Sequence, residues 1–185
     1  MELSNVTAER RQLRVLGAAV VLAATLVGWF LLGGRGSASR APAATTSGAI
    51  VSQSQLVGLA RSVDYPVYWA GPKSGYSYEV TTTHDGRFYV RYLPTGVTAG
   101  DPRASFLTVG TYSRTTAFSD LEHAAKAKGS WQVDLGRHGL LVFTPTNPKN
   151  AYFAFPGAKY QVEVYDPSGT AASRLVLAGK IVPVS

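Results

Sequence analysis

Three histidines are the side chains in this chain best suited to exchange protons near neutral pH, and each stands alone. His84 falls in an expected turn, His123 in an expected helix and His138 in a glycine-flanked turn, and none has the HExxH spacing of a zinc site. The chain has no cysteine, which excludes thiolate metal ligands, a cysteine nucleophile, disulfides and a lipid anchor on cysteine. We predict exposed or locally bonded histidines, no metal site and no cofactor.

Local signatures of catalysis are also missing from the sequence. There is no GxSxG elbow, SxxK motif or phosphate-binding P-loop. Asp120 and Glu122 are explained by the favourable position of acids in the first turn of a helix. We therefore predict no catalytic residue. A pair of carboxylates that meet only in the folded chain stays open, so a cell-envelope hydrolase or transferase with its site assembled across the fold is the alternative.

Aromatic residues are the remaining candidates for function. All ten tyrosines lie beyond residue 32, and most fall in expected strands whose alternate positions face a core. A sharper hypothesis is that the loops 70–75 and 155–159 lie side by side and form an aromatic platform with lysines at its rim. Such a surface would suit a glycan or an anionic polymer, and the net charge of +7 is compatible with that partner. The residues of this hypothetical platform are Trp69, Lys73, Tyr76, Phe153, Lys159 and Tyr160.

The two loops belong to segments that resemble each other. Tyr68–Val80 aligns without gaps on Tyr152–Val164, and six of the thirteen positions are identical. Either the chain contains an internal repeat, or two strand–loop–strand units of similar composition match by chance. The expected helices do not keep the same offset, so the sequence leaves both interpretations open.

One apolar stretch predicts the compartment in which these residues lie. Val15–Leu32 has eighteen residues without a charge, which span about 27 Å as a helix and so nearly cross a bilayer core. Arg10, Arg11 and Arg14 precede it, which favours a cytoplasmic N-terminus. The competing interpretation is a cleaved secretory signal with Ala41–Ala43 at its cleavage site, but the apolar stretch is longer than such signals usually are. Both interpretations export the rest of the chain.

The predicted organisation is a cytoplasmic tail (1–14), a transmembrane anchor (15–32), a flexible linker (33–49) and one exported domain (50–185). The linker is rich in Gly, Ala, Ser and Thr and has no apolar periodicity. The expected localisation is the cell membrane, with a single span and an extracytoplasmic C-terminal domain. Expected partners are the membrane and either a cell-wall polymer or another envelope protein.

Two short helices are predicted in the exported domain. Ser52 and Gln55 form a capping-box pattern before an apolar stripe. Ser119 is the expected N-cap of a second helix of about ten residues that ends at Gly129. Alternating or branched runs predict strands at YSYEVTTT, RFYVRYL, FLTVGTY, WQVDL, LLVFT, AYFAF, YQVEVY and RLVLAGKIVPV. The predicted fold class is α+β, mostly antiparallel sheet with two short helices.

The hairpin around Gly86 allows its register to be predicted. A two-residue loop would mix apolar and polar residues on each face of the hairpin. A three-residue loop with Gly86 in the left-handed conformation pairs Val80 with Val90 on one face, and Glu79 with Arg91 on the other. We predict the second register because a slip of one residue would move apolar side chains into water.

Gly86–Tyr92 (GRFYVRY) partly matches the aromatic RNA-binding strand of RRM domains, but two key positions differ, so we predict no nucleic-acid partner. The single N-terminal span, the small-residue tether and the motifs PVYWAGP, RFYVRYLP, FLTVGTY and YQVEVYDPS resemble uncharacterised single-pass membrane-anchored proteins of high-GC Gram-positive bacteria. The resemblance implies a membrane localisation and assigns no functional residue. We expect a membrane-anchored extracytoplasmic binding or interaction module.

Overall fold

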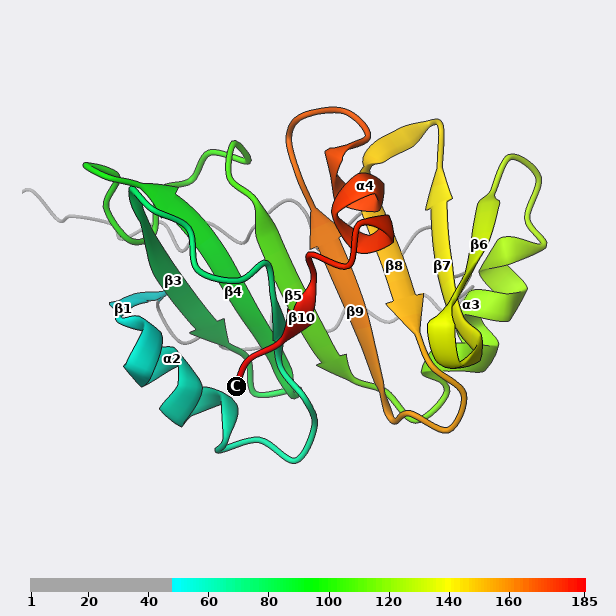
Figure 1. The fold of residues 1–185 in the computed structure, drawn as a ribbon, viewed down its shortest axis with the longest axis horizontal. Helices are drawn as coiled ribbons and strands as arrows, with labels where there is room; N and C mark the ends of the chain where they lie inside the picture. Colours follow the sequence, from blue (N-terminus) through cyan, green and yellow to red (C-terminus); the bar gives the residue numbers. More distant parts are fainter. Residues whose placement is uncertain (1–47) are drawn as a thin grey trace, which may run out of the picture.

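The computed structural model describes residues 48–185, and the expected tail, anchor and nearly all of the linker lie outside these residues. An eight-stranded antiparallel sheet dominates the fold, in the order β1-β3-β4-β5-β9-β8-β7-β6 (Figure 1). Its strands are β1 (Ala49–Val51), β3 (Tyr76–Thr82), β4 (Arg87–Pro94), β5 (Thr108–Ser113), β6 (Trp131–Leu135), β7 (Gly139–Thr144), β8 (Asn147–Ala154) and β9 (Tyr160–Tyr165).

The remaining elements lie outside this sheet. They are helices α2 (Gln53–Ala60), α3 (Ala117–Ala125) and α4 (Ala171–Leu177), the 3-10 turn η1 (Gly136–His138), and the short strands β2 (Tyr68–Trp69) and β10 (Val182–Pro183), which pair with each other. The class is therefore α+β, mostly antiparallel, with three helices. Within residues 48–185, no helix combines the length and the apolar character needed to cross a bilayer.

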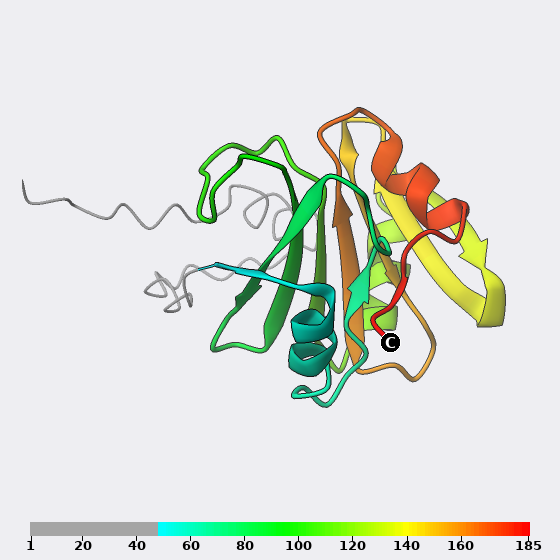
Figure 2. The ribbon, with the colours of Figure 1, turned by 60° about the vertical axis from the view of Figure 1, so that its left-hand side comes forward.

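We call the face that carries Val80, Val90, Val109 and Val164 the front face. Helix α2 lies over its β3–β4 end, the β2–β10 pair over β5 and α4 over β8, as Figures 1 and 2 show. We call the opposite face the back face. Its β7–β8 end is covered by α3, which buries Leu140 and Val142. Both faces of the sheet are thus partly covered.

The hairpin prediction is confirmed in full. Val80 pairs with Val90, and Glu79 pairs with Arg91 on the other face. Gly86 has a φ of 76°, the left-handed conformation that the three-residue loop requires. Its N–H donates to the Thr83 carbonyl and closes the turn.

The first predicted helix is also confirmed, whereas the second begins and ends earlier in the chain than predicted. In α2, the Ser52 hydroxyl accepts from the Gln55 N–H and the Gln55 side chain accepts from the Ser52 N–H. Helix α3 begins at Ala117 with Thr116 as N-cap and ends at Ala125, so Ser119 lies inside it and Gly129 lies four residues beyond its end. Ala117 is fully buried, and its burial extends the helix by nearly one turn that the capping pattern did not indicate.

The prediction of one strand over RLVLAGKIVPV is wrong, because its first four residues belong to helix α4. Ala172 and Val176, one turn apart, are buried against the sheet. Gly179 ends the helix with a φ of 64°, and the Lys180 N–H donates to the Leu175 carbonyl. The apolar run Leu175–Leu177 and the β-branched Ile181 and Val182 that follow the helix obscured these helical signals.

Candidate functional site

A row of polar side chains lies on the back face where β5, β9 and β8 are neighbours. The register places Glu163 directly opposite Gly110 on one side and Tyr152 on the other. Tyr112, two residues after Gly110, points to the same face. Four side chains from three strands are therefore brought together by the pleat of the sheet, and we call Tyr112, Asn150, Tyr152 and Glu163 the Glu163 cluster.

Three donors converge on the Glu163 carboxyl. Asn150 Nδ2 lies 2.7 Å from Oε1 and the Tyr152 hydroxyl lies 3.0 Å from the same oxygen. The Tyr112 hydroxyl donates to Oε2. Glu163 itself is only 5% exposed, so these bonds replace the water that the carboxyl loses.

Gly110 provides the space that lets Tyr112 reach the carboxyl. A Cβ at this position would stand 2.9 Å from Tyr112 Cε1 and 3.1 Å from Tyr89 Cδ1. The rings of Tyr89 and Tyr112 both lie close to Gly110, with their centroids 5.7 Å apart in a T-shaped arrangement. Any side chain at position 110 would displace at least one of them.

Burial determines the protonation of the cluster. It raises the pKa of Glu163 above its ordinary value, and the hydrogen bonds from Tyr112, Tyr152 and Asn150 oppose this rise. Burial and the nearby carboxyl also raise the pKa of both tyrosines, which therefore keep their protons and act as donors. A carboxyl that takes up a proton more easily than usual, held by fixed donors, is suited to proton exchange or to binding a small polar group.

A small hollow of about 30 Å³ adjoins the cluster beneath α3. Asn150 and Tyr152 belong both to its wall and to the Glu163 cluster, and Leu121 of α3 lies opposite. It has room for roughly two water molecules. Asn147 also lines it, and in the part of the chain that the structure describes its buried Nδ2 has no hydrogen-bond partner.

A buried ion pair lies on the same face nearer to β1. Arg91 and Glu79 are 3.0 Å apart, and their side chains are only 5% and 4% exposed. The loop after β4 closes over them, because the Gly100 N–H donates to Glu79 at 2.6 Å and Arg91 donates to the Arg103 carbonyl at 2.6 Å. With both charges bonded, this pair fixes the loop to the sheet.

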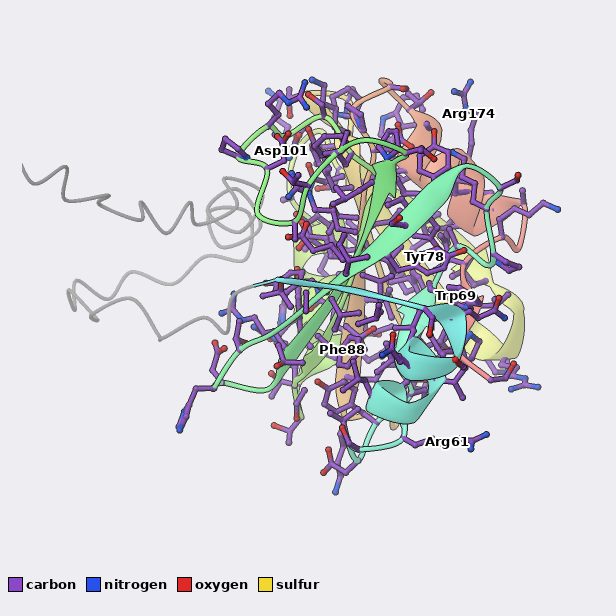
Figure 3. The ribbon with its side chains drawn as sticks, turned by 90° about the vertical axis from the view of Figure 1, so that its left-hand side faces the viewer. Arg61, Trp69, Tyr78, Phe88, Asp101 and Arg174 are labelled. Carbon is purple, nitrogen blue, oxygen red and sulfur yellow. The ribbon has the colours of Figure 1, made fainter. Side chains whose placement is uncertain are left out.

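The aromatic platform predicted from the sequence does not form. Strands β3 and β9 run in opposite directions, so the loops 70–75 and 155–159 that precede them lie at opposite ends of the sheet (Figure 1). Trp69 is buried, with its ring 5.5 Å from that of Tyr78, and Figure 3 shows the two residues close together near α2. Phe153 is buried in a separate cluster.

The other four platform residues are also divided. Lys73 Nζ lies 4.1 Å from the ring centre of Tyr76 at one end of the sheet. Tyr160 is half-buried at the other end, where its hydroxyl lies 3.4 Å from that of Tyr68, and the neighbouring Lys159 is exposed.

The similar segments around these loops also adopt different arrangements. In Tyr152–Val164 the two strands pair with each other as β8 and β9. In Tyr68–Val80 the first strand, β2, leaves the main sheet and pairs with β10.

The three histidines lie apart from one another. His84 is in the β3–β4 turn, His123 is on α3, and His138 is in η1 with a φ of 59°. Among residues 48–185, no three His, Asp or Glu side chains are grouped so that they could hold a metal ion.

The outer strand β6 offers an open edge of the sheet. Its Trp131 is 59% exposed, and the centroid of its ring lies 5.8 Å from the ring centroid of Phe143 on β7. Helices α3 and α4 contact mainly β7, β8 and β9, while Val133 and Leu135 of β6 are half-buried against the front-face core. One side of β6 presents backbone N–H and C=O groups that pair with no other strand of residues 48–185.

No family model, curated protein or solved structure is detectably similar to this chain.

Sequence reasoning missed both the Glu163 cluster and the β6 edge. The signal for the first was a pair of polar residues, Gln161 and Glu163, alternating within an otherwise apolar strand. The β6 edge had no local signal in the sequence, because it depends on the order of the strands in the sheet.

Proposed function

We propose that this chain is a single-pass membrane protein whose extracytoplasmic α+β domain is a non-catalytic binding or interaction module. The apolar stretch Val15–Leu32 and the arginines before it support the anchor and its orientation. The resemblance to membrane-anchored proteins of high-GC Gram-positive bacteria supports the same localisation. The observation that carries the interaction role is the open edge of β6 with the exposed ring of Trp131.

An edge strand binds a partner by strand addition. An extended polypeptide segment pairs its backbone with the free N–H and C=O groups, and alternate side chains provide specificity. Trp131 and Phe143 form an aromatic pair on the front face where a partner side chain would rest. The partner class is therefore an extended segment of an envelope polypeptide, and a cell-wall polymer would have to use another surface.

Photo-crosslinking in the native membrane tests this role. A photo-reactive residue is placed at Gln132 in β6 of the full chain, and the matched control carries it at Ile50 in β1 on the opposite edge. Both positions are exposed. We expect a polypeptide adduct from position 132 and none from position 50. Equal labelling from both edges, or labelling from neither, would contradict the proposal.

The topology is tested separately with protease. Added to intact cells, protease should digest residues 48–185 while a tag at the N-terminus stays protected. Protection of the C-terminal domain in intact cells, with digestion after lysis, would refute the proposed orientation.

An envelope hydrolase or transferase is the second candidate, and the Glu163 cluster favours it. A carboxyl with a raised pKa next to a small hollow could supply a proton to a leaving group. If so, the full chain should release soluble fragments from purified cell wall, and Glu163→Gln should abolish the release while the protein stays folded. Undiminished release by the variant, or no release by the native chain, would remove this candidate.

A further inference from the structure

The two edges of the main sheet differ in a way that points to a partner for one of them. β1 has three residues and leads directly into α2, so it offers little to pair with. β6 has five residues, all of which pair with β7 without a bulge. Natural edge strands are often protected by charged side chains, proline, a bulge, a covering helix or loop, or extreme shortness. β6 has no lysine, proline or bulge, and its only charged side chain is Asp134.

The side chains of β6 are arranged symmetrically about its central residue. Trp131, Val133 and Leu135 point to the front face, and Gln132 and Asp134 point to the back face. The front face of the strand is thus apolar at all three of its positions, and the back face is polar at both of its positions. Reversing its direction leaves this pattern unchanged.

Antiparallel pairing of two such strands about Val133 places apolar residues opposite apolar residues and polar residues opposite polar residues. Trp131 lies opposite Leu135 of the second copy, and Val133 lies opposite its own equivalent. On the back face Gln132 lies opposite Asp134 of the second copy, so an amide donor meets a carboxylate and the two Asp134 side chains are not directly opposed. A shift of one residue would place the apolar set against the polar set.

We propose that the occupant of the β6 edge is β6 of a second copy of this chain, so that two eight-stranded sheets join across a twofold axis at Val133. This inference rests on the proposed function, because it names the partner of the same edge. The twofold axis makes the contact self-limiting, since each copy uses its one long open edge.

Cysteine crosslinking tests the register directly, because the natural chain has no cysteine. In the proposed pairing the two Cα atoms at position 133 lie about 4.5–5.5 Å apart, within disulfide range. The two Cα atoms at position 132 would lie diagonally, about 7–8 Å apart or more, beyond easy bridging. Residues 132 and 134 of different copies face each other directly.

The experiment uses the full chain in detergent micelles under mild oxidation. Val133→Cys should give a covalent dimer, whereas Gln132→Cys and Asp134→Cys should each stay monomeric alone and form a heterodimer when mixed. Ile50→Cys on the β1 edge is the matched control and should stay monomeric. Equal crosslinking by all variants, or none by Val133→Cys, would overturn the proposal.

Charge substitutions give a second measurement that needs no crosslink. Gln132→Asp places two like-charged pairs across the interface, and Gln132→Lys places two opposite-charged pairs. At about 0.2–1 kcal/mol for each cross-strand pair, the dimer dissociation constant should rise roughly 2- to 30-fold for the first variant and fall by a similar factor for the second. Equal dissociation constants for both variants would contradict the register.

The two proposals fail in different ways. If photo-crosslinking at position 132 yields an adduct with a different polypeptide and Val133→Cys stays monomeric, the interaction role stands and self-pairing is refuted. If neither position 132 nor position 133 gives any adduct, both are refuted.

Discussion

Replacing Gly110 by alanine should destabilise this protein, although the same change usually stabilises a strand. Glycine in a strand interior costs about 0.5–1 kcal/mol relative to alanine, so an unhindered Gly→Ala substitution is favourable. The φ of Gly110 is not in the left-handed region, so its backbone would accept alanine. The sign of the effect therefore depends only on what surrounds the new methyl group.

The surroundings leave no space for that methyl group. It would stand 2.9 Å from Cε1 and 3.0 Å from the hydroxyl of Tyr112, and 3.1 Å from Cδ1 of Tyr89. Overpacking of this kind costs about 1–3 kcal/mol. If Tyr112 moves away, its hydrogen bond to Glu163 is lost at a further cost of about 1–3 kcal/mol. After the gain of about 0.5–1 kcal/mol from replacing glycine is subtracted, we expect a total loss of about 1–5 kcal/mol.

Thermal unfolding of the full chain in detergent, followed by tyrosine near-UV circular dichroism, measures this loss. For a domain of this size a change of 1 kcal/mol shifts Tm by roughly 3 °C, so Gly110→Ala should lower Tm by roughly 3–15 °C. Gly58→Ala is the control, because nothing lies within 4 Å of its added Cβ and alanine favours a helix.

A double-mutant cycle with Tyr112→Leu separates the clash from other effects. With the tyrosine ring removed, Gly110→Ala should cost much less than it does in the native chain. The reasoning is refuted if Gly110→Ala stabilises the native protein, or if its cost is the same whether or not Tyr112 is present.

Three further perturbations test other parts of the fold. Because burial raises the folded-state pKa of Glu163, the native chain should gain stability relative to Glu163→Gln as pH falls from 7 toward 4.5, which Tm values of both proteins would show; a constant difference would contradict this. Arg91→Met should cost about 3–5 kcal/mol in urea unfolding by leaving Glu79 buried and unpaired, and adding Glu79→Leu should restore most of it; no recovery would contradict the pairing argument. Ser52→Ala should cost about 0.5–2 kcal/mol by removing the N-cap of α2, and an unchanged urea midpoint would show that the cap is unimportant.

Local patterns predicted the elements whose signals lie close together in the sequence. The β3–β4 register followed from three residues of turn and the alternation on either side. The capping box of α2 followed from Ser52 and Gln55 alone. α4 was missed because its helical residues and its Gly179 stop lie around a branched run that is typical of a strand.

The candidate site could not be predicted because it depends on which strands become neighbours. Alternation placed Glu79 and Arg91 on the face opposite the core, and it carries no information about a loop that later closes over them. Glu163 meets Tyr112 only because β9 pairs with β5, fifty residues earlier in the chain, and with β8 on its other side. Strand order is a property of the whole sheet, so residue types alone left the Glu163 cluster unseen.

The tyrosine content has a structural explanation that also changes where a ligand should be sought. The Tyr92 hydroxyl accepts from the Ala70 N–H at 2.7 Å and donates to the Gly71 carbonyl at 2.9 Å. The Tyr165 hydroxyl donates to the Ala104 carbonyl at 2.6 Å. In each case the ring packs on the sheet while the hydroxyl satisfies the backbone of a loop, which helps to hold loops in a chain without cysteine. Rings used in this way are unavailable to a partner. Trp131, with 59% of its surface exposed, is the aromatic side chain on which binding should be tested first.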